Sequence, residues 1–325
     1  MSSDFKVSVV IPFYNAREYV TQAVESALAQ PETGEVILID DNSPDGGLIL
    51  CQGLAHKHKQ VRVLRHPDGQ NHGAAASRNV GILNARFPYI AFLDADDYFL
   101  SDRFSKTAEV FSEHQDAEGV YEAIGALFQE AEAQELWNRL PLNELTTINR
   151  VVPPEVLFEK LLFSNLGSFS FDGFTGKRDL FSKVGLFNEK LKYFEDTELM
   201  YKLAAKGILY PGSIAAPIAI RRVHNANRIT HLLDDERKTY AFNLDLWLAL
   251  LNWGEINLTT EQNNLLALRF IERLHKADYF NDFRFSDLLL SRKRMAKIAW
   301  KHPALMRKQL FWRKLFPAKK LIGLR

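Results

Sequence analysis

Short apolar runs alternate with segments of helical length over the first hundred residues, and this alternation restricts the fold more than any other feature of the chain. The runs are rich in Val, Ile and Leu and are bounded by turn-forming residues, as expected of strands buried on both faces. Parallel strands joined by right-handed helical crossovers have this order of segments. The sequence therefore predicts an α/β fold, with strands at residues 6–13, 35–40, 61–66 and 89–94 and helices at residues 19–28, 47–58 and 74–86.

Polar residues follow three of these strands and indicate a functional site. Ligands of open α/β sheets bind outside the carboxyl ends of the strands, where the ends of parallel strands meet. We therefore expect three clusters to converge on one edge of the sheet: Pro12-Phe13-Tyr14-Asn15, Asp40-Asp41-Asn42-Ser43 and Asp94-Ala95-Asp96-Asp97.

The last cluster places three carboxylates close together, and their repulsion at neutral pH needs an explanation. A divalent cation bound by hard oxygen donors would neutralise them. Mg²⁺ commonly binds one or two carboxylates together with substrate phosphates, so Asp94 and Asp96 would suit a metal–diphosphate complex. In the alternative interpretation, these acids only cap a helix that begins near Asp102 or border a solvated turn.

Composition and motifs exclude or disfavour several classes of protein. Cys51 is the single cysteine, which excludes a disulfide within the chain and a cysteine-based metal site. No stretch reaches the roughly 20 apolar residues of a membrane span, and the N-terminus lacks the basic lead of a signal peptide. Gly46-Gly47 is not followed by Lys-Ser/Thr, and no G-x-G-x-x-G follows the first strand, which disfavours kinase-like and dinucleotide-dependent functions.

Five segments of the chain, in this order, resemble glycosyltransferase family 2, a large family of inverting enzymes with the GT-A fold. They are VSVVIPFYNA, EVILIDDNSPDG, GAAASRNVGI, IAFLDADDYF and FEDTELMYKLAAKG, and together they extend over about residues 6–230. Each segment alone is weakly specific, whereas the ordered set is a strong signal. The resemblance implies a Rossmann-like mixed, mostly parallel sheet flanked by helices, followed here by a helical C-terminal extension.

We place a GT-A catalytic domain at residues 1–234, with a nucleotide-binding half at about 1–115 and an acceptor half at about 116–234. A helical C-terminal region with a basic amphipathic tail would cover residues 235–325. Within the acceptor half, the residue pattern predicts strands at 119–128 and 214–224, helices at 153–165 and 193–207, an irregular insertion at 130–152, and a turn-rich segment at 169–189 whose phenylalanines are mostly core.

Matching positions imply a nucleotide pocket at the first two polar clusters. Pro12 and Tyr14 begin the pocket, with the ring packed against the base. One acid of the pair Asp40-Asp41 accepts a hydrogen bond from the base, and we favour Asp40. A helix salt bridge is the alternative role for Arg78, which the match places near the nucleotide. The implied donor-binding residues are Pro12, Tyr14, Asp40, Asp41, Asn71, Arg78 and Asp94.

The resemblance also implies a metal, which we expect to be Mn²⁺ or Mg²⁺. Asp96 matches the direct ligand, and Asp94 lies nearer the ribose or just behind the ligands. His224 matches a late histidine that completes the metal or diphosphate site in some relatives, with Arg221 and Arg222 as phosphate contacts. In the alternative interpretation, His224 is an ordinary surface histidine at a strand end.

Asp196, in the pair Glu195-Asp196, matches the catalytic base of the family. An inverting transfer needs one carboxylate to remove the proton of the attacking hydroxyl, while a metal stabilises charge on the leaving diphosphate. Alternatively, both acids only stabilise the N-terminus of a helix, by ~0.3–1 kcal/mol. The residues implied for the acceptor side are Asp172, Gly173 and Glu195.

The formal net charge of +1 is the sum of an acidic body and a basic tail. Residues 292–325 hold twelve Lys/Arg and no Asp/Glu, so the remainder holds 29 basic and 40 acidic residues. Trp300, Phe311, Trp312 and Phe316 are interspersed in this tail, and basic segments with aromatic residues suit an anionic membrane surface. A plain docking helix is the alternative, and the acidic body disfavours nucleic acid as a partner.

We therefore expect a metal-dependent inverting glycosyltransferase of hexosyl or N-acetylhexosaminyl type that uses a nucleotide-diphosphate sugar, with UDP favoured. It would act on a hydroxyl of a glycan or lipid-linked acceptor in bacterial surface polysaccharide synthesis. We expect a cytoplasmic location, peripheral on the inner membrane face, and the region after residue 235 could pair subunits in a homo-oligomer. The alternatives are a sugar nucleotidyltransferase and a non-catalytic nucleotide- or glycan-binding module, which would not need Asp196.

Overall fold

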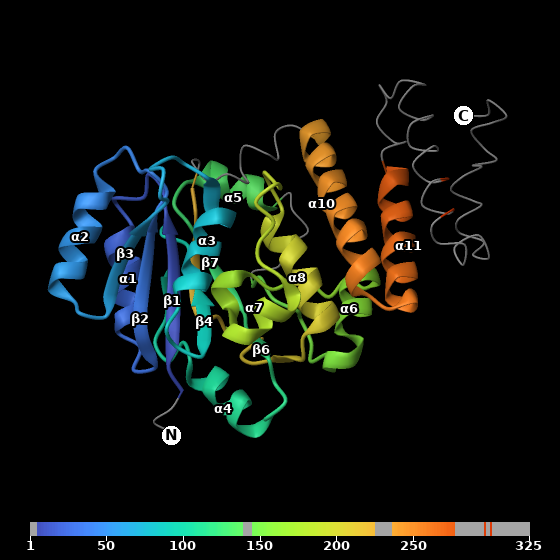
Figure 1. Ribbon diagram of the computed structural model, residues 1–325, viewed down its shortest axis with the longest axis horizontal. Helices are drawn as coiled ribbons and strands as arrows, with labels where there is room; N and C mark the ends of the chain where they lie inside the picture. Colours follow the sequence, from blue (N-terminus) through green and yellow to red (C-terminus); the bar gives the residue numbers. More distant parts are fainter. Residues whose placement is uncertain (1–4, 139–144, 225–235, 277–295, 297–299, 301–325) are drawn as a thin grey trace.

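The computed structural model describes residues 5–138, 145–224 and 236–276, together with residues 296 and 300. Almost all of the predicted basic tail therefore lies outside the described residues. The described chain forms two sheets with helices packed on them, and the two last helices lie at the side remote from β3 (Figure 1).

A seven-stranded sheet with the order β3-β2-β1-β4-β8-β6-β9 forms the centre of the molecule. Its first four strands are parallel and coincide with the four predicted apolar runs: β1 (Val7–Phe13), β2 (Thr33–Asp40), β3 (Val61–Arg65) and β4 (Tyr89–Phe92). β8 (Phe174–Lys177) runs antiparallel between β4 and β6 (Gly119–Tyr121), and β9 (Leu209–Pro211) pairs parallel with β6. The predicted mixed, mostly parallel sheet is thus confirmed.

A second sheet of three strands brings distant parts of the chain together. Its central strand β10 (Ala219–Val223) is antiparallel to β5 (Tyr98–Phe99) and parallel to β7 (Ile124–Phe128). β5 directly follows the acids that end the β4 segment, and His224 directly follows β10. This small sheet therefore places His224 beside those acids, although they are far apart in the sequence.

Helices connect the strands and cover both faces of the main sheet (Figure 1). The three predicted crossover helices are present as α1 (Val20–Leu28), α2 (Gly47–Lys57) and α3 (Gly73–Asn84). The other helices are α4 (Ser105–Glu113), α5 (Ala131–Asn138), α6 (Pro154–Phe163), the short 3₁₀ helix η1 (Phe171–Gly173), α7 (Arg178–Val184), α8 (Glu195–Lys206), α10 (Glu236–Asn257) and α11 (Thr260–Lys276). Among the described residues, none of these helices has the length and apolarity that crossing a membrane requires.

Two predictions for the acceptor half are wrong in detail. The single strand predicted at 119–128 is two strands, β6 and β7, which belong to different sheets. The chain leaves the first sheet at Glu122-Ala123, whose backbone N–H groups donate to Gly173 O and Ser213 O. The buried Glu122 carboxylate, which pairs with Arg103, accounts for this break in an otherwise apolar run. The insertion predicted to be irregular contains α5.

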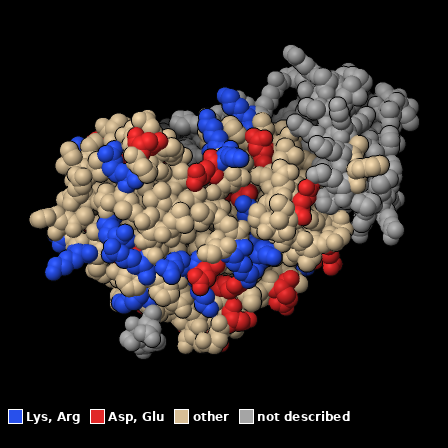
Figure 2. All heavy atoms as spheres, viewed as in Figure 1, with Lys and Arg blue, Asp and Glu red and all other residues tan. Residues whose placement is uncertain are grey.

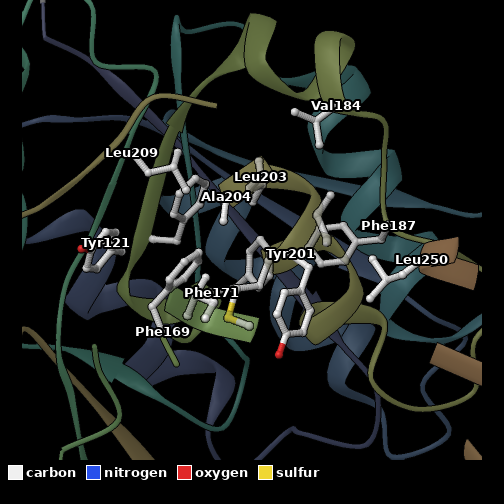
Figure 3. Close-up of a cluster of buried hydrophobic side chains, with 14 of the residues drawn as sticks. Tyr121, Phe169, Phe171, Val184, Phe187, Tyr201, Leu203, Ala204, Leu209 and Leu250 are labelled. Atoms are coloured by element: carbon white, nitrogen blue, oxygen red, sulfur yellow. The ribbon is translucent and has the colours of Figure 1, made fainter. Parts of the chain in front are cut away.

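The core consists mainly of two apolar clusters. One packs α1 and α2 on one face of the parallel strands. The other contains most of the aromatic side chains of residues 169–187, as predicted, and Figure 3 shows them packed with side chains of α8 and β9. It continues without a break into α10 and α11 through residues such as Leu246, Trp247, Leu250 and Phe270. The helical C-terminal extension is present, and it shares its core with the preceding residues.

Candidate active site

The predicted polar clusters meet at the carboxyl ends of β1, β2 and β4. Ser43 Oγ accepts a hydrogen bond from the backbone N–H of Asn15 at 2.8 Å, which joins the first two clusters directly. Asp45 Oδ2 accepts from the backbone N–H of Arg17 at 2.9 Å. Asn15 and Asn42 have φ values of 53° and 61°, a left-handed conformation that Asn tolerates better than most residues. The strand ends therefore turn sharply and bring side chains to the sheet edge.

Tyr14 and Asn71 border the predicted nucleotide pocket. Tyr14 is 53% exposed, whereas Pro12 is buried in β1 beside Ile39 of β2. An open aromatic ring at the sheet edge is suited to packing against a base. Asn71 Nδ2 donates to the carbonyl oxygen of Asp41 at 3.0 Å, so this loop lies against the second cluster.

Asp40 and Asp41 are both buried, but they have different partners. The two oxygens of Asp41 accept hydrogen bonds from the backbone N–H groups of His72 and Gly73, at 2.7 and 2.8 Å, where α3 begins. Asp40 pairs with Arg65, whose Nε lies 2.9 Å from Oδ2 and whose side chain is 45% exposed. Asp40 Oδ1 also accepts from the backbone N–H of Ser43 at 2.9 Å. Asp41 therefore stabilises a helix start, and the expected contact between Asp40 and the base stays a prediction.

The acids that end the β4 segment lie in a tight turn, in which the backbone N–H of Asp97 donates to Asp94 O at 3.0 Å. Asp94 Oδ1 accepts from Arg78 Nη2 at 2.6 Å. Asp96 Oδ2 lies 3.3 Å from His224 Nε2. The first two carboxylates of this D-x-D turn, residues 94–97, therefore have different partners, which reduces their mutual repulsion.

Asp97 is buried beside Asp172, and with Asp94 they form a group whose oxygens lie within 4.8 Å of one another. Burial raises the pKa of Asp97 well above its ordinary value, and Asp172 and Asp96 raise it further. Burial, and then Asp94, raises the pKa of Asp172 to about 6. Arg221 opposes both shifts, with Nη2 3.8 Å from Asp172 Oδ2. The raised pKa values show that these carboxylates repel one another, and Arg221 offsets part of that repulsion without a bound cation.

The donor atoms at this turn nevertheless fit a divalent cation. The Asp94 and Asp96 side chains are 36% and 27% exposed, and His224 is 13% exposed. Carboxylate oxygens and one imidazole form a ligand set suited to Mn²⁺, and the oxygens also suit Mg²⁺. The three predicted metal ligands belong to two groups of side chains. Asp94 lies near the buried Asp97 and Asp172, whereas Asp96 lies near His224.

Arg222 holds the D-x-D turn from the second sheet. Its guanidinium is buried between the rings of Tyr19 and Tyr98, at 5.2 and 4.8 Å, and donates to the carbonyl oxygen of Asp96. Tyr19 also stacks on His224, with ring centroids 5.6 Å apart. The prediction that Arg222 contacts phosphate is therefore not supported, because its guanidinium is already used inside the protein.

The predicted pair Glu195-Asp196 begins α8. Phe194, immediately before it, has φ 64°, a strained value for a residue other than glycine. Asp196 is exposed, and its Oδ1 accepts from the backbone N–H of Thr197 at 2.6 Å. Glu195 is buried instead, with Oε1 3.7 Å from Arg78 Nη1. Of the two acids, Asp196 is the one accessible to a substrate.

Arg78 joins the D-x-D turn to the start of α8, because its two terminal nitrogens reach Asp94 and Glu195. Burial alone would lower the pKa of Arg78, but Asp94, Glu195 and Asp196 raise it above its ordinary value. A fixed positive charge therefore lies between the predicted metal side and the predicted base. The alternative of a helix salt bridge is right only in part, since both partners lie outside α3.

Asp172 and Gly173, predicted for the acceptor side, lie behind the D-x-D turn. Asp172 is 1% exposed, and its Oδ1 accepts from the backbone N–H of Asp94 at 2.9 Å. A Cβ at Gly173 would lie 2.3 Å from Glu122 O, so this close approach of two main chains requires glycine. Asp172 therefore supports the turn, and both residues are buried in this structure. Glu195 likewise faces Arg78 rather than solvent.

Sequence reasoning missed several residues that hold the site. Tyr19 and Gln22 contact Arg222, and the buried pair Arg103–Glu122 lies beneath η1. A weak signal is present for Glu122 only, since it is the one charged residue inside the apolar run 119–128. Nothing local in the sequence connects this pair to Asp94, because the contacts come from segments about 70 residues apart.

Comparisons with known proteins bear on the family and the fold of this chain. The sequence model described as "Glycosyl transferase family 2" matches residues 8–185. The chain is 28% identical over 195 residues to "Uncharacterized glycosyltransferase EpsJ" of Bacillus subtilis (strain 168), a match that covers 59% of this chain and 54% of the relative. It is 30% identical over 202 residues to "Minor teichoic acid biosynthesis protein GgaB" of the same strain, covering 61% of this chain and 21% of the relative. The match thus spans about half the length of the first relative and less of the second.

A solved structure shares the fold. The crystal structure of S. aureus TarS 1-349 in complex with UDP matches with a TM-score of 0.61 at 18% identity, covering 98% of this chain and 92% of that chain. At this identity the likeness establishes the fold alone. The predicted GT-A fold is confirmed.

Proposed function

The chain belongs to glycosyltransferase family 2, and on this basis we propose that it transfers a sugar, with inversion, from a nucleotide-diphosphate donor to a hydroxyl group in a metal-dependent reaction. The observation that carries the proposal is the arrangement around Arg78, with Asp94 on one side and the start of α8 on the other. Such a transfer needs carboxylates for a cation at the donor diphosphate and a separate carboxylate for the acceptor proton.

The donor would lie along the carboxyl ends of β1, β2 and β4. Tyr14 would pack against the base, and Asp40 would accept a hydrogen bond from it. Asn71 and Pro12 would border the same pocket. We favour UDP as the nucleotide, because the similar TarS structure is a complex with UDP.

Asp96, Asp94 and His224 would hold Mn²⁺ or Mg²⁺. When bound, the cation would stabilise the negative charge that develops on the leaving diphosphate. Asp97 would keep the D-x-D turn in shape through its bond with the backbone N–H of Arg222. Arg78 would add a fixed positive charge beside the donor.

Asp196 would remove the proton from the acceptor hydroxyl. Its position in the first turn of α8 favours the ionised form by ~0.3–1 kcal/mol through the helix dipole. The bond between Oδ1 and the backbone N–H of Thr197 fixes the orientation of the carboxylate. Because Asp196 is exposed while its neighbour Glu195 is buried, we assign the base to Asp196.

We further propose that the acceptor is a hydroxyl of a glycan or lipid-linked molecule. The reaction would belong to the synthesis of a bacterial surface polysaccharide or teichoic acid. The name of the relative GgaB, a teichoic acid biosynthesis protein, supports this class. The basic tail at residues 292–325 would bind an anionic membrane surface, which would place the enzyme on the cytoplasmic face of the inner membrane, and the region after residue 235 could form a homo-oligomer. Nearly the whole tail lies outside the described residues.

Asp196→Asn tests the assignment of the base. The substitution keeps the size of the side chain but removes its ability to take a proton, so we expect a loss of transfer by about 10²–10⁴-fold. UDP affinity, measured by titration calorimetry, should stay unchanged because the proposed contacts with the nucleotide are made by other residues. Transfer would be measured as UDP release from a panel of UDP-hexoses and UDP-N-acetylhexosamines, with simple hexosides as acceptors.

Asp179→Asn is the matched control. Asp179 is an exposed acid in the first turn of α7, so it has the same relation to a helix dipole but lies in a helix outside the site. We expect wild-type transfer for this variant. Equal activity of Asp196→Asn and Asp179→Asn would contradict the proposed role and leave Asp196 with a helix-stabilising role only.

A further inference from the structure

Arg103 is fully buried and charged, and the proposed function gives it no role. It lies just before α4, with its guanidinium against the rings of Phe99 and Phe104 at 5.1 and 4.8 Å. Nη1 donates to Glu122 Oε2 at 2.7 Å, and both side chains of this ion pair have no solvent exposure. A charge so far from water must have partners that hold it in a defined position.

The Glu122 carboxylate is itself fixed from several sides. Thr107 Oγ1 donates to Oε2 at 2.6 Å, and the backbone N–H of Ser213 donates to Oε1 at 3.0 Å. A Cβ at Gly212 would lie 2.5 Å from Oε1, so the carboxylate has no room to move toward that loop. Arg103 is therefore bound to an anchor that holds it in one place.

The other terminal nitrogen of Arg103 points to the segment beneath the D-x-D turn. Nη2 donates to the carbonyl oxygen of Asp172 at 3.2 Å and to Thr175 Oγ1 at 3.3 Å. Asp172 belongs to η1, and its Oδ1 accepts from the backbone N–H of Asp94 at 2.9 Å. Two hydrogen bonds through one residue thus connect the buried ion pair to the first acid of the turn.

Buried ion pairs add little to stability on average, because the cost of removing two charges from water is about as large as their attraction. The pair is better explained by the position that it gives to η1. We propose that Arg103 is a positioning residue for the metal–donor site. It holds the main chain at Asp172, so that the Asp172 carboxylate supports Asp94 and the turn keeps the shape that binds Mn²⁺ with the donor diphosphate. This inference rests on the proposed function of Asp94 and Asp96.

Arg103→Lys tests the inference. Lysine keeps a positive charge for Glu122 but has a single terminal nitrogen, so the Nη2 group that reaches Asp172 O and Thr175 Oγ1 is lost. Partners that orient metal ligands commonly contribute 10–100-fold in metal affinity, so we expect the dissociation constant for Mn²⁺ with saturating UDP to rise about 10-fold. Free Mn²⁺ would be measured by electron paramagnetic resonance. UDP affinity without Mn²⁺ should not change, and the KM for Mn²⁺ in transfer should rise more than kcat falls.

Arg62→Lys is the matched control, because Arg62 pairs with the buried carboxylate of Glu35 at the same distance of 2.7 Å. Glu35 lies near the start of β2, at the opposite edge of the sheet from the D-x-D turn. We expect unchanged Mn²⁺ binding for this variant. If both lysine variants lose Mn²⁺ affinity equally, the effect reflects general destabilisation and the inference fails.

Wild-type Mn²⁺ affinity in Arg103→Lys would overturn the inference and leave the proposed function intact. If Arg103→Lys does not fold, the double variant Arg103→Met/Glu122→Gln decides, because it leaves no buried charge and keeps an acceptor for the Ser213 N–H. A folded double variant with weakened Mn²⁺ binding supports the inference, and an unfolded one, or one with normal binding, overturns it. A wild-type protein without UDP-dependent Mn²⁺ binding would contradict the proposed function, and the inference with it.

Discussion

Single residues in the candidate site are placed by partners that come from distant segments. Arg78 of α3 contacts Asp94 after β4 and Glu195 of α8, and Arg222 at the end of β10 holds the main chain at Asp96. Each acid of the D-x-D turn has an arginine, an imidazole or a backbone donor close to it, so the surroundings of the cluster stabilise it. The sequence shows the carboxylates of this turn, but it does not show the residues that pair with them.

Cys51 offers a test of the packing next to the nucleotide pocket. Burial, and then Asp40 and Asp45, raises the pKa of the Cys51 thiol to about 12 from an ordinary value of 9.0. The thiolate is the reactive form, so its fraction at pH 8 falls by about a thousandfold. We expect no reaction with 5,5′-dithiobis(2-nitrobenzoic acid) at pH 8 in the native protein and full reaction in urea.

The sign of the accompanying stability change follows from the same shift. A raised pKa means that the folded state disfavours the thiolate, so its contribution to stability is present below the ordinary pKa and is lost as the pH rises above 9. Rapid labelling of native Cys51 at pH 8 would show that α2 does not pack on β1 and β2 as described.

At the scale of elements, the approach of α3 to the sheet determines where Arg78 lies. Gly81 of α3 packs directly on the parallel strands, since a Cβ at this position would lie 2.3 Å from Val10 Cγ1 and 3.1 Å from Ile39 Cδ1. Arg78 lies one turn earlier on the same helix. This close approach fixes the position of α3 on the sheet, and with it the position of the Arg78 guanidinium.

Gly81→Ala should therefore be destabilising, although alanine favours helices. Overpacking in a well-packed core costs about 1–3 kcal/mol, and we expect a loss of this size in urea unfolding. Gly53→Ala in α2 is the control, because no atom lies within 4 Å of its Cβ position. It should stabilise the protein by about 0.5–1 kcal/mol. A gain in stability for both variants would show that α3 does not need its close contact.

At the scale of the whole molecule, α10 and α11 share a core with the helix that bears Asp196. The rings of Tyr201 in α8 and Trp247 in α10 lie 5.3 Å apart, and Lys202 lies 5.5 Å from the Trp253 ring. Gln262 Nε2 of α11 donates to Ala205 O at 3.1 Å. The predicted domain boundary between residues 234 and 235 stays a prediction, but one apolar cluster extends across it. Figure 2 shows acidic and basic side chains interspersed among uncharged ones on the face that it draws.

Trp247→Ala tests whether this shared core unfolds as one unit. Trp247 is 2% exposed, and truncation of a buried tryptophan costs about 3–5 kcal/mol. We expect a single calorimetric transition, moved as a whole to a lower temperature. Ile256→Ala on the same helix is the control, because Ile256 is 87% exposed and its loss should change stability by less than about 0.5 kcal/mol. Two separate transitions, of which only one responds to Trp247→Ala, would show that α10 and α11 form an independent domain.

The periodicity of apolar residues predicted most of the elements, since it acts locally along the chain. It failed at residues 119–128, where a buried ion pair with Arg103 divides one apolar run between two sheets. For the site, the strand ends indicated which residues gather at the edge of the sheet, and the roles expected of Asp40, Asp94, Asp96, Asp196 and His224 stay predictions. The roles of Asp172, Gly173 and Glu195 could not be read, because burial behind the turn depends on segments from elsewhere in the sequence.

The sequence by itself determined the α/β alternation, the parallel strands and the edge of the sheet that carries the acids, because these follow from spacing and from turn residues. Only the tertiary structure decided which acids are exposed to solvent and which are buried behind them as hydrogen-bond partners. That decision depends on the long-range placement of three arginines, Arg78, Arg103 and Arg222, whose partners are 16 to 200 positions away along the chain.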